Sequence, residues 1–449
     1  MISEAAIFKG KLLAHARTPL YGNGYALVMS SGISSVLGLL YWALAARMYT
    51  PDAVGFSAAT ISAMMFLAGL AQLNLMSALL RFVPEAGQQA ARFIAVTYAV
   101  SMAVAAVASV VFGHSIGVFV PTLSEIGASA PLLLWFAAAT VGWCVFVLED
   151  SALTGLRRAG WVPISNTGFS VAKIVLLVVL AATFPQYGVF ASWTIALAGA
   201  IVLTNLVLFT RVLPRRSKDA VQSGNGLSVK TISRFVFTDY LGSLCWLACT
   251  TLLPIVVASV AGIRATAYFY LAWQIGYGLH MISINMSYSL VVEGATDPQQ
   301  LANFSKRMVL LNLRIIVPGA ALVAIVAPYV MGLFGAAYEA EGSGLLRLLA
   351  LAAVPYSIVP VYVSIVRVQR LVRRAAAVLA VMCVMVLTLS EILLRQFGLE
   401  GVGVAWLLTQ TALGGYLFLF QLRPLWIRAS SQGADARQPL HTTEVGSGD

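Results

Sequence analysis

The chain is a series of long apolar runs separated by short polar connections. Most runs exceed the roughly 20 residues that a helix needs to cross a bilayer core of about 30 Å. The runs lack strict alternation, and lipid offers the backbone no hydrogen-bond partners, so a helical bundle is expected rather than a barrel. Twelve spans are predicted, at about residues 25–46, 54–82, 93–113, 130–150, 162–183, 188–210, 234–260, 265–293, 308–334, 344–366, 374–396 and 401–422.

The first two runs flank a hinge that contains Pro51 and Asp52. The hinge is too short to hold a domain, so the two runs are predicted to form an antiparallel helical hairpin. Within the second run, Asn74, Ser77 and Arg81 recur at helical spacing. Because lipid penalises polar side chains, we expect this face to line protein or a hydrated cavity.

The longest polar interruption lies midway along the chain, with six spans on either side. The predicted organisation is a cytoplasmic or interfacial N-terminus (1–24), an N-lobe of six spans (25–210), a cytoplasmic linker (211–233), a C-lobe of six spans (234–422) and a disordered cytoplasmic tail (423–449). A weak internal repeat is consistent with two halves. Span two can be laid over span eight, so that Asn74 matches Asn285, and the hinges before them contain Arg47 and Arg264.

Composition supports a membrane protein: 60% of residues are hydrophobic and 10% are charged, against about 25% charged residues in a typical soluble domain. The net charge of +11 comes from Lys and Arg in alternate connections, and the opposite connections carry mostly acids. The positive-inside rule then places both termini in the cytoplasm, in a plasma or inner membrane. This arrangement explains the charge without a nucleic-acid partner.

Charged residues within the spans are the first candidates for function. Lys173 lies near the middle of span five, where a charge costs roughly 2.5–3.5 kcal/mol, so it should face the interior. Asp239 lies about a turn and a half from the cytoplasmic end of span seven, where it could be solvated, pair with a basic residue or bind a coupling cation.

Other polar residues are predicted to have local roles. Glu149 and Asp150 end span four close to Arg157 and Arg158, which predicts an ion-pair cluster. Glu391 should pair with an arginine one turn later, at position 395. A lone histidine at position 280 is expected to form a structural hydrogen bond.

Span eight has a face that is both aromatic and polar. Its members recur at steps of three and four residues and are Tyr270, Gln274, Tyr277, Met281, Asn285 and Tyr288. Aromatic rings stack on sugars and amides bond hydroxyls, so this face could hold a glycan. Packing between helices, with the tyrosines bonded to neighbours, is the alternative that the sequence leaves open.

Several kinds of site are not found in the sequence. It contains no P-loop, no metalloprotease or hydrolase motif, no plausible catalytic carboxylate pair and no extramembrane loop long enough for a catalytic domain. We therefore predict a protein that is not an enzyme and that has no catalytic residues, cofactor or metal.

The hinge region resembles the opening of polysaccharide-export proteins. The resemblance rests on Ala45-Ala46-Arg47, then Tyr49-Thr50-Pro51 and Val54-Gly55-Phe56, and on the exit Arg81-Phe82-Val83-Pro84-Glu85. These proteins are lipid-linked oligosaccharide flippases of the multidrug/oligosaccharidyl-lipid/polysaccharide (MATE-like) superfamily. The strong motif covers about residues 24–85, and the plan of twelve spans in two halves extends the match over the chain.

The resemblance implies two six-helix lobes around a central cavity that opens to alternate sides. It implies transport of a polyprenyl-diphosphate-linked oligosaccharide, such as an O-antigen precursor, with the bilayer and possible glycan-assembly enzymes as partners. Arg and Lys side chains would then lie near the diphosphate, and the tyrosines of span eight would carry the glycan. The candidate substrate-binding residues are Lys173, Arg81, Arg47, Asn74, Gln274, Tyr277, Asn285 and Tyr288. The alternative is a cation-coupled drug antiporter, with Asp239 as the ion-coupling candidate. The predicted N-lobe has no acid in mid-membrane, which favours an anionic substrate.

Overall fold

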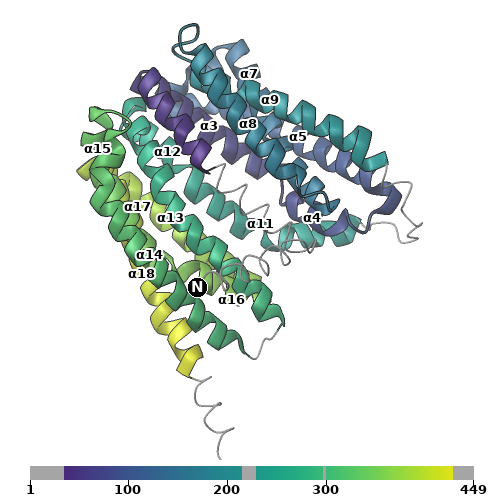
Figure 1. Ribbon diagram of the computed structural model, residues 1–449, viewed down its shortest axis with the longest axis vertical. Helices are drawn as coiled ribbons and strands as arrows, with labels where there is room; N and C mark the ends of the chain where they lie inside the picture. Colours follow the sequence, from purple (N-terminus) through teal and green to yellow (C-terminus); the bar gives the residue numbers. More distant parts are fainter. Residues whose placement is uncertain (1–34, 215–228, 297–299, 428–449) are drawn as a thin grey trace, which may run out of the picture.

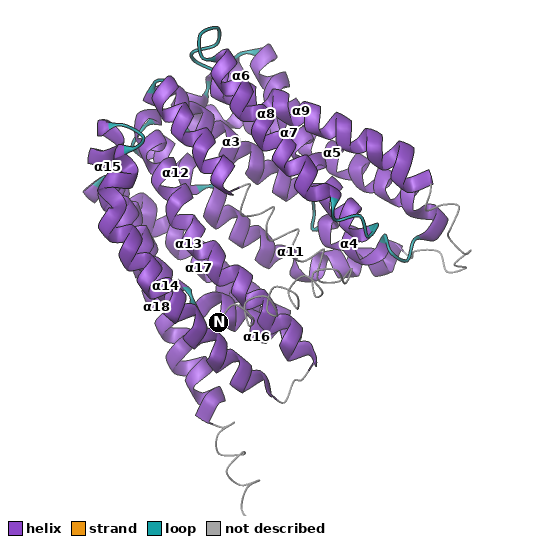
Figure 2. Ribbon diagram, in the orientation of Figure 1, coloured by secondary structure: helices purple, strands orange, loops and turns teal. Residues whose placement is uncertain are grey.

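The computed structural model describes residues 35–214, 229–296 and 300–427. Side chains are described throughout these ranges except at residues 229–239, 292, 293, 295 and 296. Every regular element within them is a helix (Figure 2). The predicted N-terminus (1–24), the start of span one and most of the predicted linker and tail lie outside the described residues.

The helices before residue 215 pack mainly on one another and form the first bundle. It contains the helix Ser35–Met48, α3 (Pro51–Ala71), α4 (Leu75–Phe82), η1 (Gly87–Gln89), α5 (Ala90–Phe119), η2 (Pro121–Leu123), α6 (Glu125–Ala128), α7 (Ala130–Gly155), α8 (Trp161–Leu180), α9 (Gly188–Val207) and the π-helical turn η3 (Leu208–Val212).

The helices after residue 228 form the second bundle. It contains α11 (Val229–Thr251), α12 (Leu253–Val260), α13 (Ile263–Thr296), α14 (Leu301–Gly332), α15 (Ala336–Tyr356), α16 (Ile358–Val368), α17 (Val372–Phe397), α18 (Leu399–Tyr416) and the π-helical turn η5 (Leu417–Leu422).

The described part of the chain contains 9 helices that are long and apolar enough to cross a membrane. The pair α11 and α12 adds a broken span, bent by 41°. The polar α13 is not among them, although its 34 residues exceed the length that a bilayer requires. This architecture confirms the predicted all-α polytopic membrane fold.

Two predicted spans are interrupted. The second breaks between α3 and α4, where Leu73 and Asn74 adopt left-handed backbone angles (φ 48° and 57°). The Ser77 hydroxyl donates to Asn74 Oδ1 at 2.9 Å, so Asn74 begins a new helix instead of continuing the face of α3. The seventh bends at Leu252, close to Pro254, whose ring removes a backbone donor.

Some predicted boundaries are also wrong. The last helix of the first bundle continues to residue 214, and α11 begins at Val229, so the predicted linker at 211–233 is shorter at both ends. The predicted tail at 423–449 begins with helix as far as residue 427. The hydrophobic periodicity fades within these basic segments, which explains why it ended the predicted spans inside the helices.

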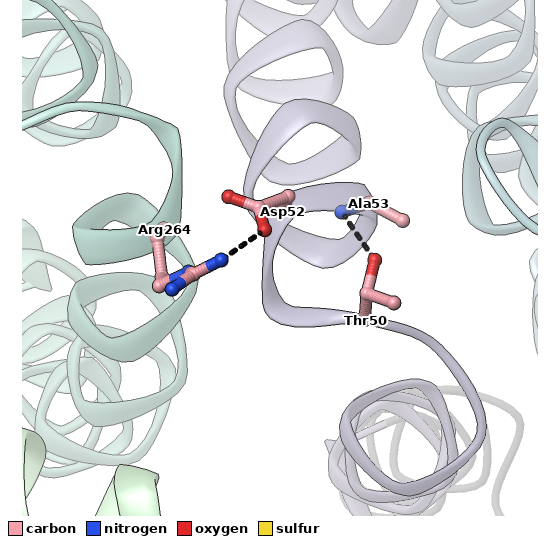
Figure 3. A network of polar contacts seen from close by, with 4 residues as sticks. All are labelled: Thr50, Asp52, Ala53 and Arg264. Carbon is pink, nitrogen blue, oxygen red and sulfur yellow. Dashed lines mark hydrogen bonds and ion pairs between the residues drawn. The ribbon is translucent and has the colours of Figure 1, made fainter.

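The two bundles meet where α3 and α13 begin, which we call the hinge end, and diverge toward α4 and α16 (Figure 1). Figure 3 shows the ion pair at the hinge end, in which Arg264 Nη2 lies 2.8 Å from Asp52 Oδ2. Gly55 of α3 packs against the backbone of Ile263. A side chain at position 55 would collide with the Ile263 carbonyl oxygen. α3 therefore forms the centre of the molecule, in contact with helices of both bundles.

Candidate functional site

Lys173 is buried inside the first bundle. It lies on α8, on a face whose other buried members are Phe169, Ser170 and Leu177, at helical spacing. Its side chain is 5% exposed. This burial is consistent with the prediction that Lys173 faces the interior of the protein.

Three aromatic rings surround the Lys173 ammonium. Its Nζ lies 3.9 Å from the centroid of the Trp193 ring and 4.9 Å from the centroids of Tyr41 and Phe169. Each distance is within the roughly 6 Å at which a ring face attracts a cation. We call these four residues the lysine cage.

The cage leaves the charge of the lysine without a counterion. In the described part of the chain, no carboxylate lies within salt-bridge distance of Lys173. The Trp193 Nε1 donor is also buried and has no hydrogen-bond partner. The Tyr41 hydroxyl, in contrast, donates to Val189 O at 2.7 Å. The cage thus holds one cation and one N–H donor for which the first bundle supplies no acceptor.

Aromatic contacts lead from the cage to the second bundle. Trp42 lies 6.3 Å from Trp193 and 4.6 Å from Tyr270 of α13, between ring centroids. Tyr270 is buried, and its helix packs on α3 of the first bundle. The cage therefore lies next to the surface on which the two bundles meet.

The predicted polar face of α13 divides into two parts. In the first part, the Tyr277 ring stacks on the rings of Trp273 and Trp246, with centroids 5.5 and 6.3 Å apart. Tyr277 therefore packs against other side chains of the second bundle. In the second part, Asn285 is exposed and Tyr288 is 55% exposed. Helix packing accounts for the first part of this face, and the second part is available to a ligand.

The predicted arginines make their described contacts away from the cage. Arg47 Nε donates to the Leu333 carbonyl of the second bundle at 2.6 Å, at the hinge end. Arg81 is exposed at the end of α4, with its guanidinium carbon 5.4 Å from the centroid of Phe82. Asn74 lies at the start of α4, which carries none of the cage residues. The side chain of Asp239 lies outside the description.

The ion-pair cluster predicted around Glu149 is wrong. Glu149 is fully buried, and its Oε2 accepts a hydrogen bond from Asn205 Nδ2 at 2.6 Å. Arg157 and Arg158 are exposed, beyond the end of the helix. Sequence proximity suggested the pairing, but α7 turns the carboxylates toward α8 and α9 while the arginines project into solvent.

Two other local predictions are confirmed. His280 is buried, and its Nε2 accepts a hydrogen bond from Trp406 Nε1 at 2.8 Å. Arg395 Nη2 lies 3.0 Å from Glu391 Oε1, one helical turn away.

The rings of the cage were not predicted from the sequence. Phe169 lies four residues before Lys173 on the same helix, which was a usable signal. Tyr41, Trp42 and Trp193 come from other helices, and no spacing rule connects them to Lys173. Among the described residues, no group of three or more His, Cys, Asp or Glu could hold a metal.

Hollows of about 220 and 190 Å³ lie on the molecule. The larger is lined by Arg158, Trp161 and Arg211, among others, and the smaller by residues 87–91 and 209–214. Both belong to the first bundle and neither lies between the bundles. The central cavity stays a prediction.

No protein-family model matches the chain, and no curated protein matches its sequence. Solved structures share its fold. One is an inward-facing multidrug resistance MATE family transporter of the MOP superfamily (16% identity, TM-score 0.70, 89% of this chain and 96% of the other). Another is the lipid II flippase MurJ in an inward closed conformation (11% identity, TM-score 0.67, 90% of each chain). A third is a MATE crystal structure in complex with MaL6 (16% identity, TM-score 0.64, 93% and 97%). The fold expected from the hinge motif is confirmed.

Proposed function

We propose that this membrane protein, which has the fold of MATE transporters and of the MurJ flippase, is itself a flippase. Its substrate would be a polyprenyl-diphosphate-linked oligosaccharide or a related polysaccharide precursor, moved from the cytoplasmic to the outer leaflet by alternating access. The observation that carries the proposal is the buried Lys173 ammonium, which has three aromatic neighbours and no counterion.

A diphosphate and its sugars cannot cross hydrocarbon unaided, although the polyprenyl chain can stay in the lipid. A fixed cation lowers the barrier for the charged part, because opposite charges about 4 Å apart attract by roughly 4 kcal/mol at an effective dielectric of 20. Lys173 and Trp193 Nε1 supply a charged and a neutral donor of the kind that phosphate oxygens accept. A carboxylate at this place would favour a cationic substrate.

The rings hold the lysine while no substrate is bound. Two of the aromatic residues at this site, Tyr41 and Trp42, belong to the helix Ser35–Met48, which also contacts the second bundle through Trp42 and Arg47. In our proposal, phosphate oxygens replace ring faces around the ammonium, and the helix Ser35–Met48 shifts as Tyr41 moves away. This shift changes the contacts of the helix with the second bundle. Substrate binding is thereby linked to the relative position of the bundles.

The glycan would lie along the exposed part of α13. Asn285 offers an amide and Tyr288 a phenol ring, both exposed in the second half of α13, which runs from the hinge end toward the side on which the bundles diverge (Figure 1). The positive-inside rule assigns this side to the cytoplasm and the hinge end to the outside. With an inside-negative potential, outward movement of each negative charge gains about 2.3 kcal/mol per 100 mV. Glycan-assembly enzymes on either side would be natural partners.

A cation-coupled antiporter of small molecules is the second candidate. It is favoured by the two buried carboxylates of α7, Glu149 and Asp150, which resemble the acids that bind cations in membrane proteins. The lysine cage argues against a cationic drug as the transported molecule.

Reconstitution in proteoliposomes separates the two candidates. A fluorescent lipid-diphosphate glycan should become accessible to a membrane-impermeant quencher on the opposite leaflet, and a fluorescent organic cation should not be transported. Uptake of the cation without movement of the glycan headgroup would refute the proposal in favour of the antiporter.

A further inference from the structure

The larger hollow, of about 220 Å³, lies at one end of the first bundle. Its lining consists of Arg158, Trp161, Val207, Arg211 and Val212. Tyr187, directly before α9, contacts the ring of Phe56 at the start of α3, so α9 begins at the hinge end and η3 lies at the opposite end. Lys173 is about three turns further along α8 than Trp161, so the hollow is separate from the lysine cage.

Two unusual backbone turns lie beside this hollow. Arg157 adopts a left-handed backbone angle (φ 58°), which residues other than glycine rarely do, where the chain passes from α7 into α8. On the other side, residues 208–212 form a π-helical turn, a rare kind of turn that is often part of a functional site. The Ser165 and Thr204 hydroxyls, 2.8 Å apart, fasten α8 to α9 about one turn away. The two segments that carry the arginines of the hollow are therefore held next to each other.

Arg158 and Arg211 place two positive charges in one hollow. Both residues are exposed, and neither guanidinium forms a hydrogen bond or an ion pair within the part of the chain that the structure describes. Like charges repel, and each guanidinium offers five N–H donors in a planar arrangement that matches a phosphate. The positive end of the α8 dipole, at Trp161, adds to the same field. None of the residues that line the hollow is acidic, so its donors and its charge suit an anionic ligand.

The hollow continues into an apolar surface. Ile164 lies three residues after Trp161 on α8 and is 61% exposed, and Leu203 lies four residues before Val207 on α9 and is 66% exposed. At these spacings each shares a helix face with a residue of the hollow. Trp161 itself is half-exposed at the end of a membrane-spanning helix, where indole rings lie at the level of lipid headgroups. A ligand that fits both parts is an amphiphile with an anionic head.

We propose that the hollow binds the phosphate headgroup of an anionic phospholipid. Arg158 and Arg211 donate to the phosphate oxygens, and the acyl chains lie along Ile164 and Leu203. The volume of about 220 Å³ is below the roughly 300–1,000 Å³ of pockets for drug-sized ligands, which suits a small headgroup. The positive-inside rule assigns this end of the bundle to the cytoplasm, where basic pockets between membrane helices bind anionic headgroups.

The bound lipid joins two segments of the first bundle. Its phosphate bridges the turn between α7 and α8, which carries Arg158, and the end of α9, which carries Arg211. The lipid is therefore expected to stabilise the packing of α8 on α9. The site includes neither Lys173 nor α13, so it can exist whether or not the chain moves a lipid-linked glycan.

Native mass spectrometry of the purified full-length protein tests the site. Dioleoyl-phosphatidylglycerol and dioleoyl-phosphatidylcholine have the same acyl chains, and only the first has a net negative headgroup. We expect one phosphatidylglycerol to bind at least about tenfold more tightly than phosphatidylcholine, because hydrogen bonds to charged groups are strong. Glycerol phosphate, which has no acyl chains, should not displace it at equal concentration. Equal affinities for the two lipids, or displacement by glycerol phosphate, would overturn the proposal.

Neighbouring arginines locate the lipid. Arg158→Gln and Arg211→Gln, singly and together, should weaken phosphatidylglycerol binding about tenfold or more. Arg157→Gln removes the same charge from an exposed residue that does not line the hollow, and it should keep the wild-type affinity. Without added lipid, all of these variants should unfold at the wild-type temperature, because the side chains are exposed. Wild-type affinity in the double variant, or an equal loss in Arg157→Gln, would refute the site.

Discussion

Replacement of Lys173 by methionine separates the functional role of this charge from a structural one. Methionine keeps the length and flexibility of the side chain and removes the ammonium. The three rings of the cage stay in place to pack around an apolar side chain. Any large effect of the substitution then reports the charge.

The expected change in stability is small because two terms nearly cancel. A lysine within a membrane-spanning helix costs about 2.5–3.5 kcal/mol on insertion scales. The close ring of Trp193, at 3.9 Å, returns about 2 kcal/mol when desolvated, and the two rings at 4.9 Å return about 0.5–1 kcal/mol each. Lys173→Met should therefore change the free energy of unfolding by no more than about 1 kcal/mol.

The expected change in transport is much larger. Loss of an attraction of roughly 4 kcal/mol between the ammonium and a phosphate corresponds to a rate lower by about a hundredfold to a thousandfold. Headgroup movement in proteoliposomes gives this rate, with Lys173→Arg as the variant that keeps the charge. Lys306→Gln, at an exposed position on α14, is the control for loss of a lysine. Wild-type transport by Lys173→Met would refute the role of the charge, and a large loss of stability with transport retained would make the lysine structural.

Further substitutions test the contacts between the bundles and the glycan surface. Gly55→Leu should lower the free energy of unfolding by about 1–3 kcal/mol in a thermal unfolding experiment, because the side chain meets the Ile263 backbone, whereas Gly38→Leu should not. Arg264→Gln should leave the melting temperature unchanged, because the ion pair at the hinge end is largely exposed, but should increase the inter-bundle distances measured there by spin labels. Tyr288→Ala should weaken glycan-lipid transport severalfold without loss of stability, since 55% of the residue is exposed, and a destabilised variant would indicate packing instead.

The sequence was sufficient for the membrane class and for the burial of Lys173. Both follow from the cost of placing polar groups in lipid, which acts on each helix separately. The break at Asn74 was not predictable in the same way. The residues around it are apolar and helix-compatible, and only the left-handed angles at Leu73 and Asn74 show that the helix stops.

The candidate site depended more on tertiary structure. Burial of a lysine could be predicted, but its partners could not, because Tyr41 and Trp193 lie 132 residues before and 20 residues after it in the chain. The same limit explains the error at Glu149. Its nearest basic residues in sequence are exposed, and its actual partner, Asn205, is on another helix.

The most direct test of the account is a structure of the protein with a lipid-diphosphate glycan bound. The account predicts the diphosphate within direct hydrogen-bonding distance of Lys173 Nζ, about 2.7–2.9 Å from nitrogen to oxygen, with the sugars along Asn285 and Tyr288. A diphosphate bound elsewhere, with the three rings still closed around the ammonium, would contradict it.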